Sequence, residues 1–381
     1  MKKLKLVTIL GTRPEIIRLS EVIKKCDLYF NHILAHTGQN FDYMLNQVFF
    51  DDLNLRAPDY YLNVGGGNLG ETIGNIIAKS YKLLKEEEPD ALLILGDTNS
   101  ALSAISAKRL KIPIFHMEAG NRCFDENLPE EINRRIVDHI ADVNLCYSEH
   151  ARRYLNHEGR SLERTYVTGS PMAEVLSTNI DGIRSSNVLD RLGLEAYNYI
   201  LVSAHREENI DIEDNFFSLM NSINSMALTY QKQIIYSVHP RSKKIIEERS
   251  FKFHENVKMF DPFGFLDYCK LQTCAFCVVS DSGTLAEECS YFKFPAVLIR
   301  TSTERPEAVD KGNIIIGGIT EKEVLQAVEL AVQMKINEDN GTFVPDYIDE
   351  NVSAKVVKII QGYVGIVNFM VWRKNRFEKD S

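Results

Sequence analysis

The sequence predicts an α/β protein made of two doubly wound, Rossmann-like domains. Short β-rich runs alternate with helical patterns along most of the chain, as in successive βαβ units. Most of these runs end abruptly in polar clusters, and α/β sheets place their sites at such strand ends. The alternation pauses around Gly169-Ser170-Pro171 and restarts near residue 199. The 381 residues suit two or three domains of about 100–200 residues each.

In the first half, Lys5–Leu10 reads as a strand that runs into Gly11-Thr12-Arg13-Pro14-Glu15 and then a helical pattern. A helix N-terminus at the end of a parallel strand attracts anions, and Arg13 and Arg18 add positive charge there. Further elements are expected as a strand at 33–36, helices at 71–88, 99–109 and 130–141, and strands at 92–95, 112–116 and 143–147.

Three carboxylates follow the strands in the middle of this half. Asp97 comes after the strand at 92–95, and Glu118 comes after the strand at 112–116. Glu131 lies in Pro129-Glu130-Glu131, where a proline and acidic neighbours indicate a helix start. Acid–base chemistry at one edge of the sheet is therefore expected.

The second half repeats the pattern, with strands expected near 199–203, 234–238, 276–280 and 296–300 and helices near 213–229, 263–272, 284–292 and 320–335. Polar clusters that follow these strands contain His205, His239, Arg241, Ser282, Gly283 and Arg305. A Ser-Gly pair at a helix start can bind a phosphate, and a carboxylate one turn on, here Glu287 or Glu288, can bind the hydroxyls of a ribose. The histidines and arginines could neutralise a diphosphate without a metal.

The C-terminal helical run is expected to pack on a core and to cross back to the first domain. The predicted domains are therefore residues 1–173 with 363–381, and residues 174–362. No apolar run reaches the roughly 20 residues of a membrane helix.

The composition excludes several classes of protein. A net charge of −9 argues against nucleic-acid binding. Seven cysteines without a regular framework, and no signal peptide, favour a cytoplasmic enzyme. We expect neither a membrane partner nor a cofactor or metal.

Two motifs are interpreted as structural. The stretch Gly65–Gly70 matches the dinucleotide pattern G-x-G-x-x-G, but it does not open the first strand–helix unit, so we interpret it as a surface loop. Cys274-x-x-Cys277 stands without a second pair and is interpreted as core rather than as a zinc or redox site.

Taken in order, the clusters resemble those of the non-hydrolysing UDP-N-acetylglucosamine 2-epimerase family over nearly the whole chain. The matching segments are Gly11–Glu15, Gly96–Thr98, Glu118–Gly120, Pro129–Arg134, His205–Glu207, Ser280–Gly283 and Thr303–Glu307. The resemblance implies a glycosyltransferase-B-like fold with the domains facing across a cleft, a homodimer, and interconversion of a UDP-2-acetamido sugar with its C2 epimer.

The resemblance also implies roles for individual residues. Asp97, Glu118 and Glu131 would form the acid–base set, while Arg13 and His205 would stabilise the leaving diphosphate. Ser282 and Gly283 would hold phosphate, and Glu288 would hold the uridine ribose. The family reaction eliminates UDP across C1–C2 to give a glycal and then adds it back, which requires a base, an acid and a stabilised leaving group. Which carboxylate serves which face stays open.

Departures from the family pattern concern both the activation of the enzyme by a second UDP-sugar and the identity of the substrate sugar. Arg18 replaces a common lysine, and Thr284 replaces a second glycine. Gly38-Gln39-Asn40-Phe41 replaces a segment that helps bind a second, activating UDP-N-acetylglucosamine in bacterial members, which argues against such allostery here. Within residues 121–129, Asn121-Arg122-Cys123-Phe124 and Asn127-Leu128-Pro129, together with the C-terminal runs at 362–368 and 371–375, resemble the subgroup that acts on UDP-2-acetamido-2,6-dideoxy-L-hexoses and yields UDP-N-acetyl-L-fucosamine for surface polysaccharides. A UDP-sugar glycosyltransferase and a catalytically silent UDP-sugar binding protein are the alternatives from other classes.

Overall fold

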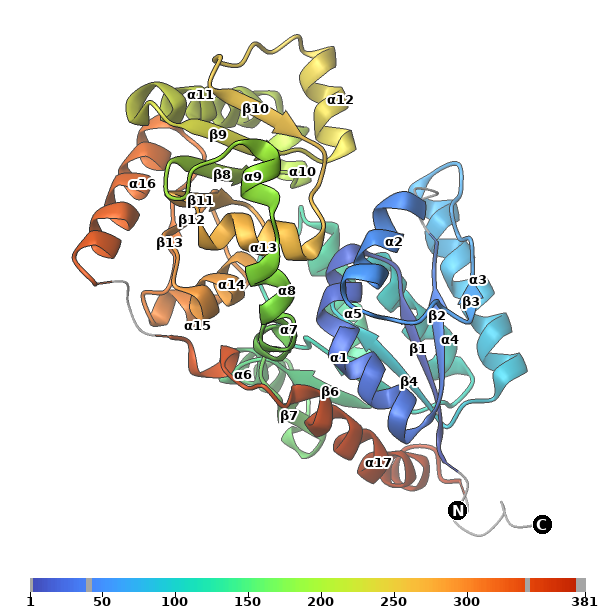
Figure 1. Cartoon of the computed structure of the whole chain (residues 1–381). Coiled ribbons are helices and arrows are strands. Elements are labelled where there is room, and N and C mark those ends of the chain that lie inside the picture. The colour runs from blue at the N-terminus through green and yellow to red at the C-terminus, as the bar shows by residue number, and fades with distance from the viewer. Residues whose placement is uncertain (1–2, 39–42, 340–342, 375–381) are drawn as a thin grey trace. The chain divides into compact units, whose positions relative to one another are not determined.

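The computed structural model describes residues 3–38, 43–339 and 343–374 (Figure 1). The chain divides into two compact units, and each contains one parallel sheet. Unit 1 is Met1–Val175 with Asp349–Ser381, and unit 2 is Leu176–Ile348. Within the described part of the chain, no helix has both the length and the apolar character that a membrane span needs.

Unit 1 alternates strands and helices along most of its length. Its elements are β1 (Lys5–Leu10), α1 (Arg13–Tyr29), β2 (Asn31–His36), α2 (Tyr43–Asp52), β3 (Tyr60–Tyr61), α3 (Leu69–Glu87), β4 (Ala91–Leu95), η1 (Asn99–Leu102), α4 (Ser103–Arg109), β5 (Ile114–Met117), α5 (Pro129–Ile140), β6 (Val143–Cys146), α6 (Glu149–His157), η2 (Leu162–Arg164), β7 (Thr165–Val167) and α17 (Val352–Met370). Helix α7 (Met172–Thr178) begins in unit 1 and ends in unit 2. The strand order is β3-β2-β1-β4-β5-β6-β7, with every pair parallel. This is the Rossmann order with one more strand at the edge.

Local sequence fixes where the helices of unit 1 begin. Pro14 lies in the first turn of α1 and Pro129 in the first turn of α5, where a missing N–H costs nothing. The Asn68 side chain accepts the Glu71 N–H and so caps α3, which identifies Gly65–Gly70 as a loop and helix start. β4 is buried along its whole length, as a central strand covered on both faces should be.

The long C-terminal helix α17 returns to unit 1, where it packs on α1. Glu174 accepts hydrogen bonds from the Ser353 backbone and hydroxyl, and Lys355 Nζ donates to the Thr168 carbonyl at 2.9 Å. The expected limits were 173/174 and 362/363, whereas the compact units change at 175/176 and 348/349. The return comes earlier because the whole helix that packs on α1 begins at Val352.

Unit 2 repeats the same plan with its own strands. Its elements are α8 (Ile180–Ser185), α9 (Val188–Leu192), β8 (Tyr199–Ser203), α10 (Glu207–Ile210), α11 (Glu213–Tyr230), β9 (Gln233–Ser237), α12 (Pro240–Glu248), β10 (Val257–Phe260), α13 (Phe265–Thr273), β11 (Cys277–Ser280), α14 (Leu285–Phe292), β12 (Ala296–Leu298), α15 (Pro306–Asp310), β13 (Ile315–Ile316), α16 (Glu321–Ile336) and η3 (Pro345–Tyr347). The all-parallel order β10-β9-β8-β11-β12-β13 is the six-stranded Rossmann order.

Alternate residues of the central strands of unit 2 serve two cores. In β8, Ile200 and Val202 belong to the core under α11 and α16, while Tyr199 and Leu201 belong to the core under α13 and α14. Successive side chains of a strand point to opposite faces, so both faces of the sheet are covered. Cys277 is buried in β11, where burial raises the pKa of its thiol, which supports the interpretation of the C-x-x-C pair as core.

Candidate active site

In each sheet the strand order reverses at one place, and four of the predicted site residues, Arg13, Asp97, His205 and Ser282, follow the strands at that place. In unit 1 the reversal lies between β1 and β4, so the loops carrying Arg13 and Asp97 leave in opposite directions. In unit 2 it lies between β8 and β11, which carry His205 and Ser282. Ligands of open α/β sheets bind at the carboxyl ends of the strands at such a reversal.

Arg134 joins two of the three predicted carboxylates of unit 1. Its Nη2 lies 2.5 Å from Asp97 Oδ2, and its Nη1 lies 3.2 Å from Glu131 Oε2. Asn133, one position earlier on α5, donates to the Asp97 carbonyl at 3.0 Å. The start of α5 therefore fixes the loop that follows β4, and Asp97 keeps 22% of its side chain accessible.

Glu131 is fully buried and has several donors around it. Besides Arg134, its Oε2 accepts the Cys123 backbone N–H at 3.2 Å and the Cys123 thiol at 3.3 Å. Its Oε1 accepts Arg135 Nη2 at 3.1 Å. Charge-assisted bonds on both oxygens hold this carboxylate in one orientation.

Glu118 occupies a strained position directly after β5. Its backbone φ is +62°, which few residues other than glycine adopt, and such strain is concentrated at functional sites. Arg18 Nη1 donates to its Oε2 at 2.6 Å, and Asn121 Nδ2 donates to its Oε1 at 3.3 Å. A Cβ on Gly96 would lie 3.1 Å from Glu118 Oε2, so the glycine gives the carboxylate room.

A buried charge network holds the loop that carries Glu118. Asp138 accepts the Gly120 N–H at 3.2 Å and lies 3.0 Å from His116 Nδ1. Arg122 donates to Asp138 at 2.7 Å and to the Asn121 carbonyl at 2.6 Å. A second carboxylate, Glu158, binds the other side of the Arg122 guanidinium at 2.8 and 2.6 Å.

Glu15 connects the loops after β1 and β4. Its Oε2 accepts the Gly11 N–H at 3.1 Å, the Thr12 hydroxyl at 2.8 Å and the Thr98 hydroxyl at 3.0 Å, while Oε1 accepts the Ser100 hydroxyl. Burial raises the pKa of Glu15, and these donors oppose that rise. We did not assign it from sequence, although it ends the Gly11–Glu15 cluster.

Asp281 holds the loop after β8 in unit 2. Its Oδ2 accepts the backbone N–H groups of His205 and Arg206, both at 2.9 Å, and Asn209 Nδ2 at 3.2 Å. His205 Nδ1 lies 3.3 Å from the other carboxylate oxygen. Asp281 is fully buried.

The start of α14 and the loop after β12 line a small pocket. Its lining residues include Ser282 and Gly283 at the helix start and Arg300, Thr303, Glu304 and Arg305 in the loop. The hydroxyls of Ser282 and Thr284 are 3.0 Å apart, so Thr284, which replaces the usual second glycine, adds a hydroxyl at the helix start. Hydroxyls, backbone N–H groups and guanidinium groups together suit a phosphate.

Glu288 and Arg305 are both buried in unit 2. Glu288 Oε2 accepts Gln272 Nε2 at 2.5 Å, so α13 orients this carboxylate. Arg305 Nη2 lies 3.8 Å from Glu287 Oε1. Glu304, beside it, accepts Arg300 at 2.6 Å and Arg206 at 3.3 Å, which connects the loops after β8 and β12.

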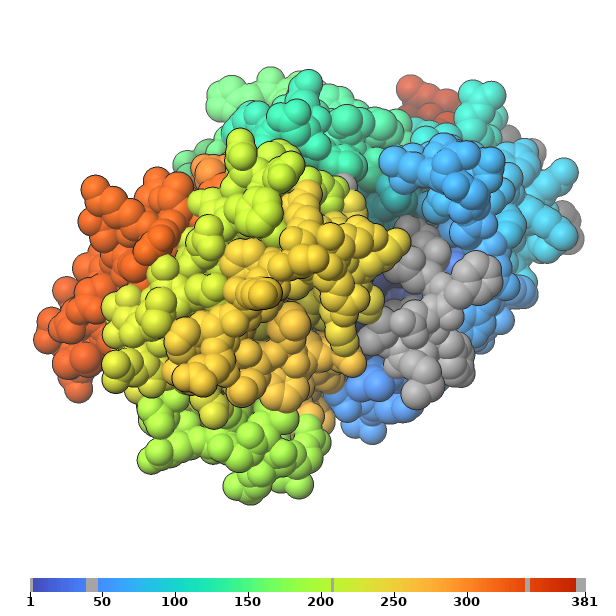
Figure 2. Space-filling view, turned by 90° about the horizontal axis from the view of Figure 1, so that it is seen from above, coloured from blue at the N-terminus to red at the C-terminus, as the bar shows by residue number. Residues whose placement is uncertain are grey.

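His239 and Arg241 lie at the start of α12. The His239 ring centroid is 6.4 Å from that of His205, and its Nδ1 accepts the Arg241 N–H at 3.3 Å, so it also caps the helix. Arg241 Nη2 pairs with Asp211 at 2.6 Å, and about half of its side chain is exposed. The segment from α12 to β10 lies on the outside of unit 2 (yellow in Figure 2).

Arg13 lies over the Phe49 ring at 5.7 Å, and the structure thus places it beside α2 as well as at the start of α1. The segment singled out at 38–41 includes residues 39–41, which lie outside the described residues. Sequence reasoning gave no roles to Arg122, Arg134, Asp138 or Glu304, because charge pairing between distant segments leaves no local pattern.

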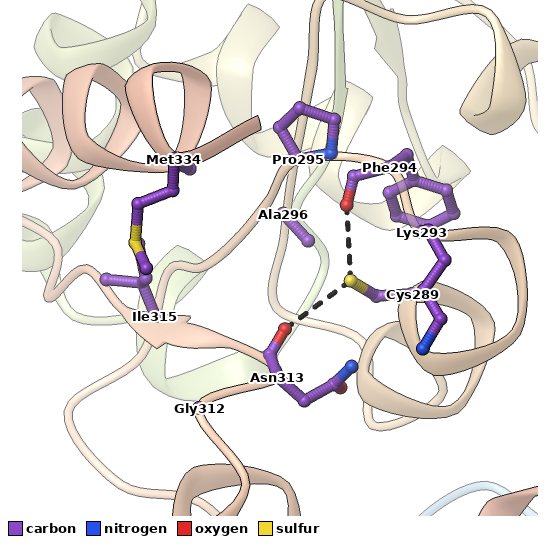
Figure 3. A pocket seen from close by; sticks show the side chains of 10 residues that line it. Cys289, Lys293, Phe294, Pro295, Ala296, Gly312, Asn313, Ile315 and Met334 are labelled. Atoms are coloured by element: carbon purple, nitrogen blue, oxygen red, sulfur yellow. Dashed lines mark hydrogen bonds between the residues drawn. The ribbon is translucent and has the colours of Figure 1, made fainter. Parts of the chain in front are cut away.

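A second pocket in unit 2 lies at the amino ends of β12 and β13, where Ala296 and Ile315 begin these strands (Figure 3). Its Cys289 thiol donates to the Phe294 carbonyl at 3.2 Å and the Asn313 carbonyl at 3.5 Å. Burial raises the pKa of Cys289 to about 12, which keeps this thiol protonated. Among the described residues, no group of three or more His, Cys, Asp or Glu is placed to hold a metal ion.

Two Rossmann-like units, one with carboxylates and the other with a phosphate-type pocket after its switch-point strands, define a nucleotide-sugar enzyme. The chain belongs to the UDP-N-acetylglucosamine 2-epimerase family, whose model matches residues 24–361. The chain is therefore an isomerase, and the predicted family, fold class and reaction class are confirmed.

Individual relatives agree over nearly the whole chain. The UDP-N-acetylglucosamine 2-epimerase of Methanocaldococcus jannaschii is 35% identical over 88% of this chain and 94% of its own. A solved UDP-N-acetylglucosamine 2-epimerase from Rickettsia bellii is 47% identical with a TM-score of 0.90, covering 98% of this chain and all of that one. A solved M. jannaschii complex with UDP-GlcNAc and UDP is 33% identical with a TM-score of 0.88, covering 94% and 99%.

Proposed function

We propose that the protein interconverts UDP-N-acetylglucosamine and UDP-N-acetylmannosamine by elimination and re-addition of UDP. The proposal is supported by family membership and by the M. jannaschii relative that is solved with UDP-GlcNAc and UDP. The observation that carries it is the set of three carboxylates after β4 and β5, each held by an arginine in unit 1.

The residue types match what the reaction demands. A base takes the proton from C2 while the C1–O bond breaks, and the electron pair of that bond leaves with UDP. Re-addition forms the C1–O bond again while an acid returns a proton to the other face of C2. We assign the proton transfers to Asp97, Glu118 and Glu131. Proton transfer by a placed side chain contributes roughly 10²–10⁴-fold.

The leaving diphosphate needs cations and hydrogen-bond donors rather than acids. We assign this role to Arg13 and His205, we assign phosphate binding to Ser282 and Gly283, and we assign added positive charge at the start of α1 to Arg18. His239, Arg241 and Arg305 would add positive charge, and Glu288 would bind the uridine ribose. A donor aimed at developing charge contributes about 2.7–4 kcal/mol, so several are needed for a diphosphate.

The 6-deoxy sugar is a second candidate substrate, and one observation favours it. Residues 121–129 resemble the subgroup acting on UDP-2-acetamido-2,6-dideoxy-L-hexoses, and two of them contact the predicted acids directly. Asn121 donates to Glu118, and Cys123 donates to Glu131. These residues therefore lie where they could select the sugar. By the same resemblance we propose a cytoplasmic homodimer that supplies a precursor of surface polysaccharide, with light scattering as the check on the dimer.

The experiment is an exchange assay in D₂O with UDP-N-acetylglucosamine and, separately, with the UDP-2-acetamido-2,6-dideoxy-L-talose analogue. Deuterium at C2 of substrate and product is expected with one of them. Absence of exchange with both sugars would refute the epimerase, and a requirement for an acceptor sugar would indicate a glycosyltransferase. Asp97→Asn should lower the rate roughly 10²–10⁴-fold. Glu86→Gln is the matched control, because the Glu86 side chain is 61% exposed on α3.

A further inference from the structure

In unit 2, Asp281 lies beneath His205 and divides its two oxygens between two tasks. Oδ2 accepts three N–H donors, from the backbone of His205, the backbone of Arg206 and the side chain of Asn209. Oδ1 is buried without a hydrogen bond of ordinary geometry, and His205 Nδ1 lies 3.3 Å from it. A buried carboxylate oxygen demands a donor, and this ring nitrogen lies within reach of it.

We propose that Asp281 is a positioning residue that fixes the tautomer and the orientation of His205. The proposal rests on the assignment of His205 to the leaving diphosphate. With Nδ1–H donated to Asp281, Nε2 is the ring nitrogen turned away from the carboxylate. A proton on Nε2 then makes an imidazolium whose charge the buried carboxylate balances, and Nε2–H can donate to the diphosphate.

Hydrogen bonds around Asp281 fix the position of its carboxylate, so this carboxylate can fix the orientation of the His205 ring. Asn209 donates at the same time to Asp281 and to the Ile299 carbonyl, at 3.2 and 3.1 Å, and is itself 2% exposed. The Asp281 backbone N–H donates to the Ser203 carbonyl at 3.1 Å. The carboxylate is therefore connected to the ends of β8 and β12. A hydrogen bond to it restricts the orientation of the His205 imidazole. The His205 side chain stays 37% exposed.

Asp281→Asn separates the two tasks of the carboxylate. Three N–H donors at the Oδ2 position require an acceptor, so the amide oxygen must lie there and the amide NH₂ must face His205 Nδ1. Nδ1 then has to accept, and its proton moves to Nε2. The loop after β8 keeps its hydrogen bonds while the tautomer of His205 reverses, and no counter-charge remains for an imidazolium.

The test uses long-range ¹H–¹⁵N spectra of the full-length protein labelled at histidine, with His205 assigned by the loss of its signals in His205→Gln. We expect Nδ1–H in the wild type and Nε2–H in Asp281→Asn. UDP is the probe, and it should shift the Nε2 signal of the wild type. Asn209→Ala is the matched control, because it removes one donor to Oδ2 and should leave the tautomer unchanged.

Kinetics give the second readout. Because charge on the leaving oxygen grows only as the C1–O bond breaks, Asp281→Asn should lower kcat about 10²-fold and change KM much less. Asp281→Ala should lower thermal stability as well, since it also removes the acceptor of the loop.

A wild-type spectrum without Nδ1–H, or the same tautomer in Asp281→Asn, would overturn the proposal. So would a His205 signal that UDP leaves unchanged, even in an active enzyme. If the wild type shows the expected tautomer and UDP shift but exchanges no deuterium at C2, the epimerase assignment fails and the Asp281–His205 pair stands. The wild-type spectrum decides the pairing even where the variant does not fold.

Discussion

Glu15 offers the sharpest test of how unit 1 holds the loops that carry Arg13 and Asp97. Its carboxylate accepts four donors, two from the loop after β1 and two from the segment after β4. Thr12 adjoins Arg13, and Thr98 adjoins Asp97. Glu15→Ala removes the connection, whereas Glu15→Gln keeps the shape and removes only the charge. The two variants should therefore behave differently.

The magnitude follows from the donors that lose their acceptor. An unsatisfied buried donor costs about 1–3 kcal/mol. The Thr98 and Ser100 hydroxyls are 2.7 Å apart and can bond each other, which leaves the Gly11 N–H and the Thr12 hydroxyl as the main losses. Burial raises the pKa of Glu15, so removing the charge also relieves a desolvation cost. We expect Glu15→Ala to lower the free energy of unfolding by about 2–4 kcal/mol.

For Glu15→Gln the amide oxygen can take the Oε2 position with its three donors, and the NH₂ can donate to the Ser100 hydroxyl. We expect its unfolding free energy to lie within about 1 kcal/mol of the wild type. Misplacing reacting groups by about 1 Å costs about 10²-fold, so Glu15→Ala should also lose about that factor in kcat.

Urea denaturation gives the stabilities, and deuterium exchange at C2 gives kcat. The control is Glu86→Ala, since the Glu86 side chain is 61% exposed and its nearest described cation, Lys82, is 3.9 Å away. Equal stability and rate in Glu15→Ala and the wild type would refute the reasoning. A Glu15→Gln variant as impaired as Glu15→Ala would show that the charge, rather than the bridge, is what matters.

Two further predictions concern the charge network under Glu118. Arg122→Met leaves the buried Asp138 without its cation, so the free energy of unfolding, measured in urea, should fall by about 3–5 kcal/mol; an unchanged value would contradict the network. Burial alone would raise the pKa of Glu158, but hydrogen bonds from Arg122 and His139 lower it to about 2, from an ordinary value of 4.5. Ionised Glu158 therefore contributes to the free energy of unfolding above pH 4.5, and this contribution is lost as the pH falls through 2. Glu158→Gln should flatten the decline of the unfolding free energy between pH 4.5 and 2.

Much of the fold could be read from local pattern. The run at 92–95 and the observed β4 agree within one residue, because a central buried strand is apolar throughout. The strand expected at 112–116 is instead Ile114–Met117, since Pro113 has no N–H to donate to a ladder. All four edge strands, β3, β7, β10 and β13, were missed. β3 and β13 span two residues each, and so short a segment carries no periodicity.

The site residues also divide into those that a local sequence pattern indicates and those that it does not. Asp97, Glu118 and His205 were predicted as site residues because polar residues that end a buried strand stand out in the sequence. Glu15 and Asp281 lie within the same clusters, yet nothing local distinguishes a ligand-binding acid from one that holds a loop. That distinction depends on donors brought from other segments, such as Thr98 to Glu15.

The sequence by itself determined the α/β class, the order of the polar clusters and, through their resemblance, the family. Those features depend on short-range periodicity and on residue types at strand ends. Only the tertiary structure decided the strand orders, the partner of each carboxylate and the return of α17 to unit 1 at Asp349. Hydrogen bonds and ion pairs join residues that are far apart in the chain, such as Arg18 and Glu118, and the sequence carries no signal for the distance between them.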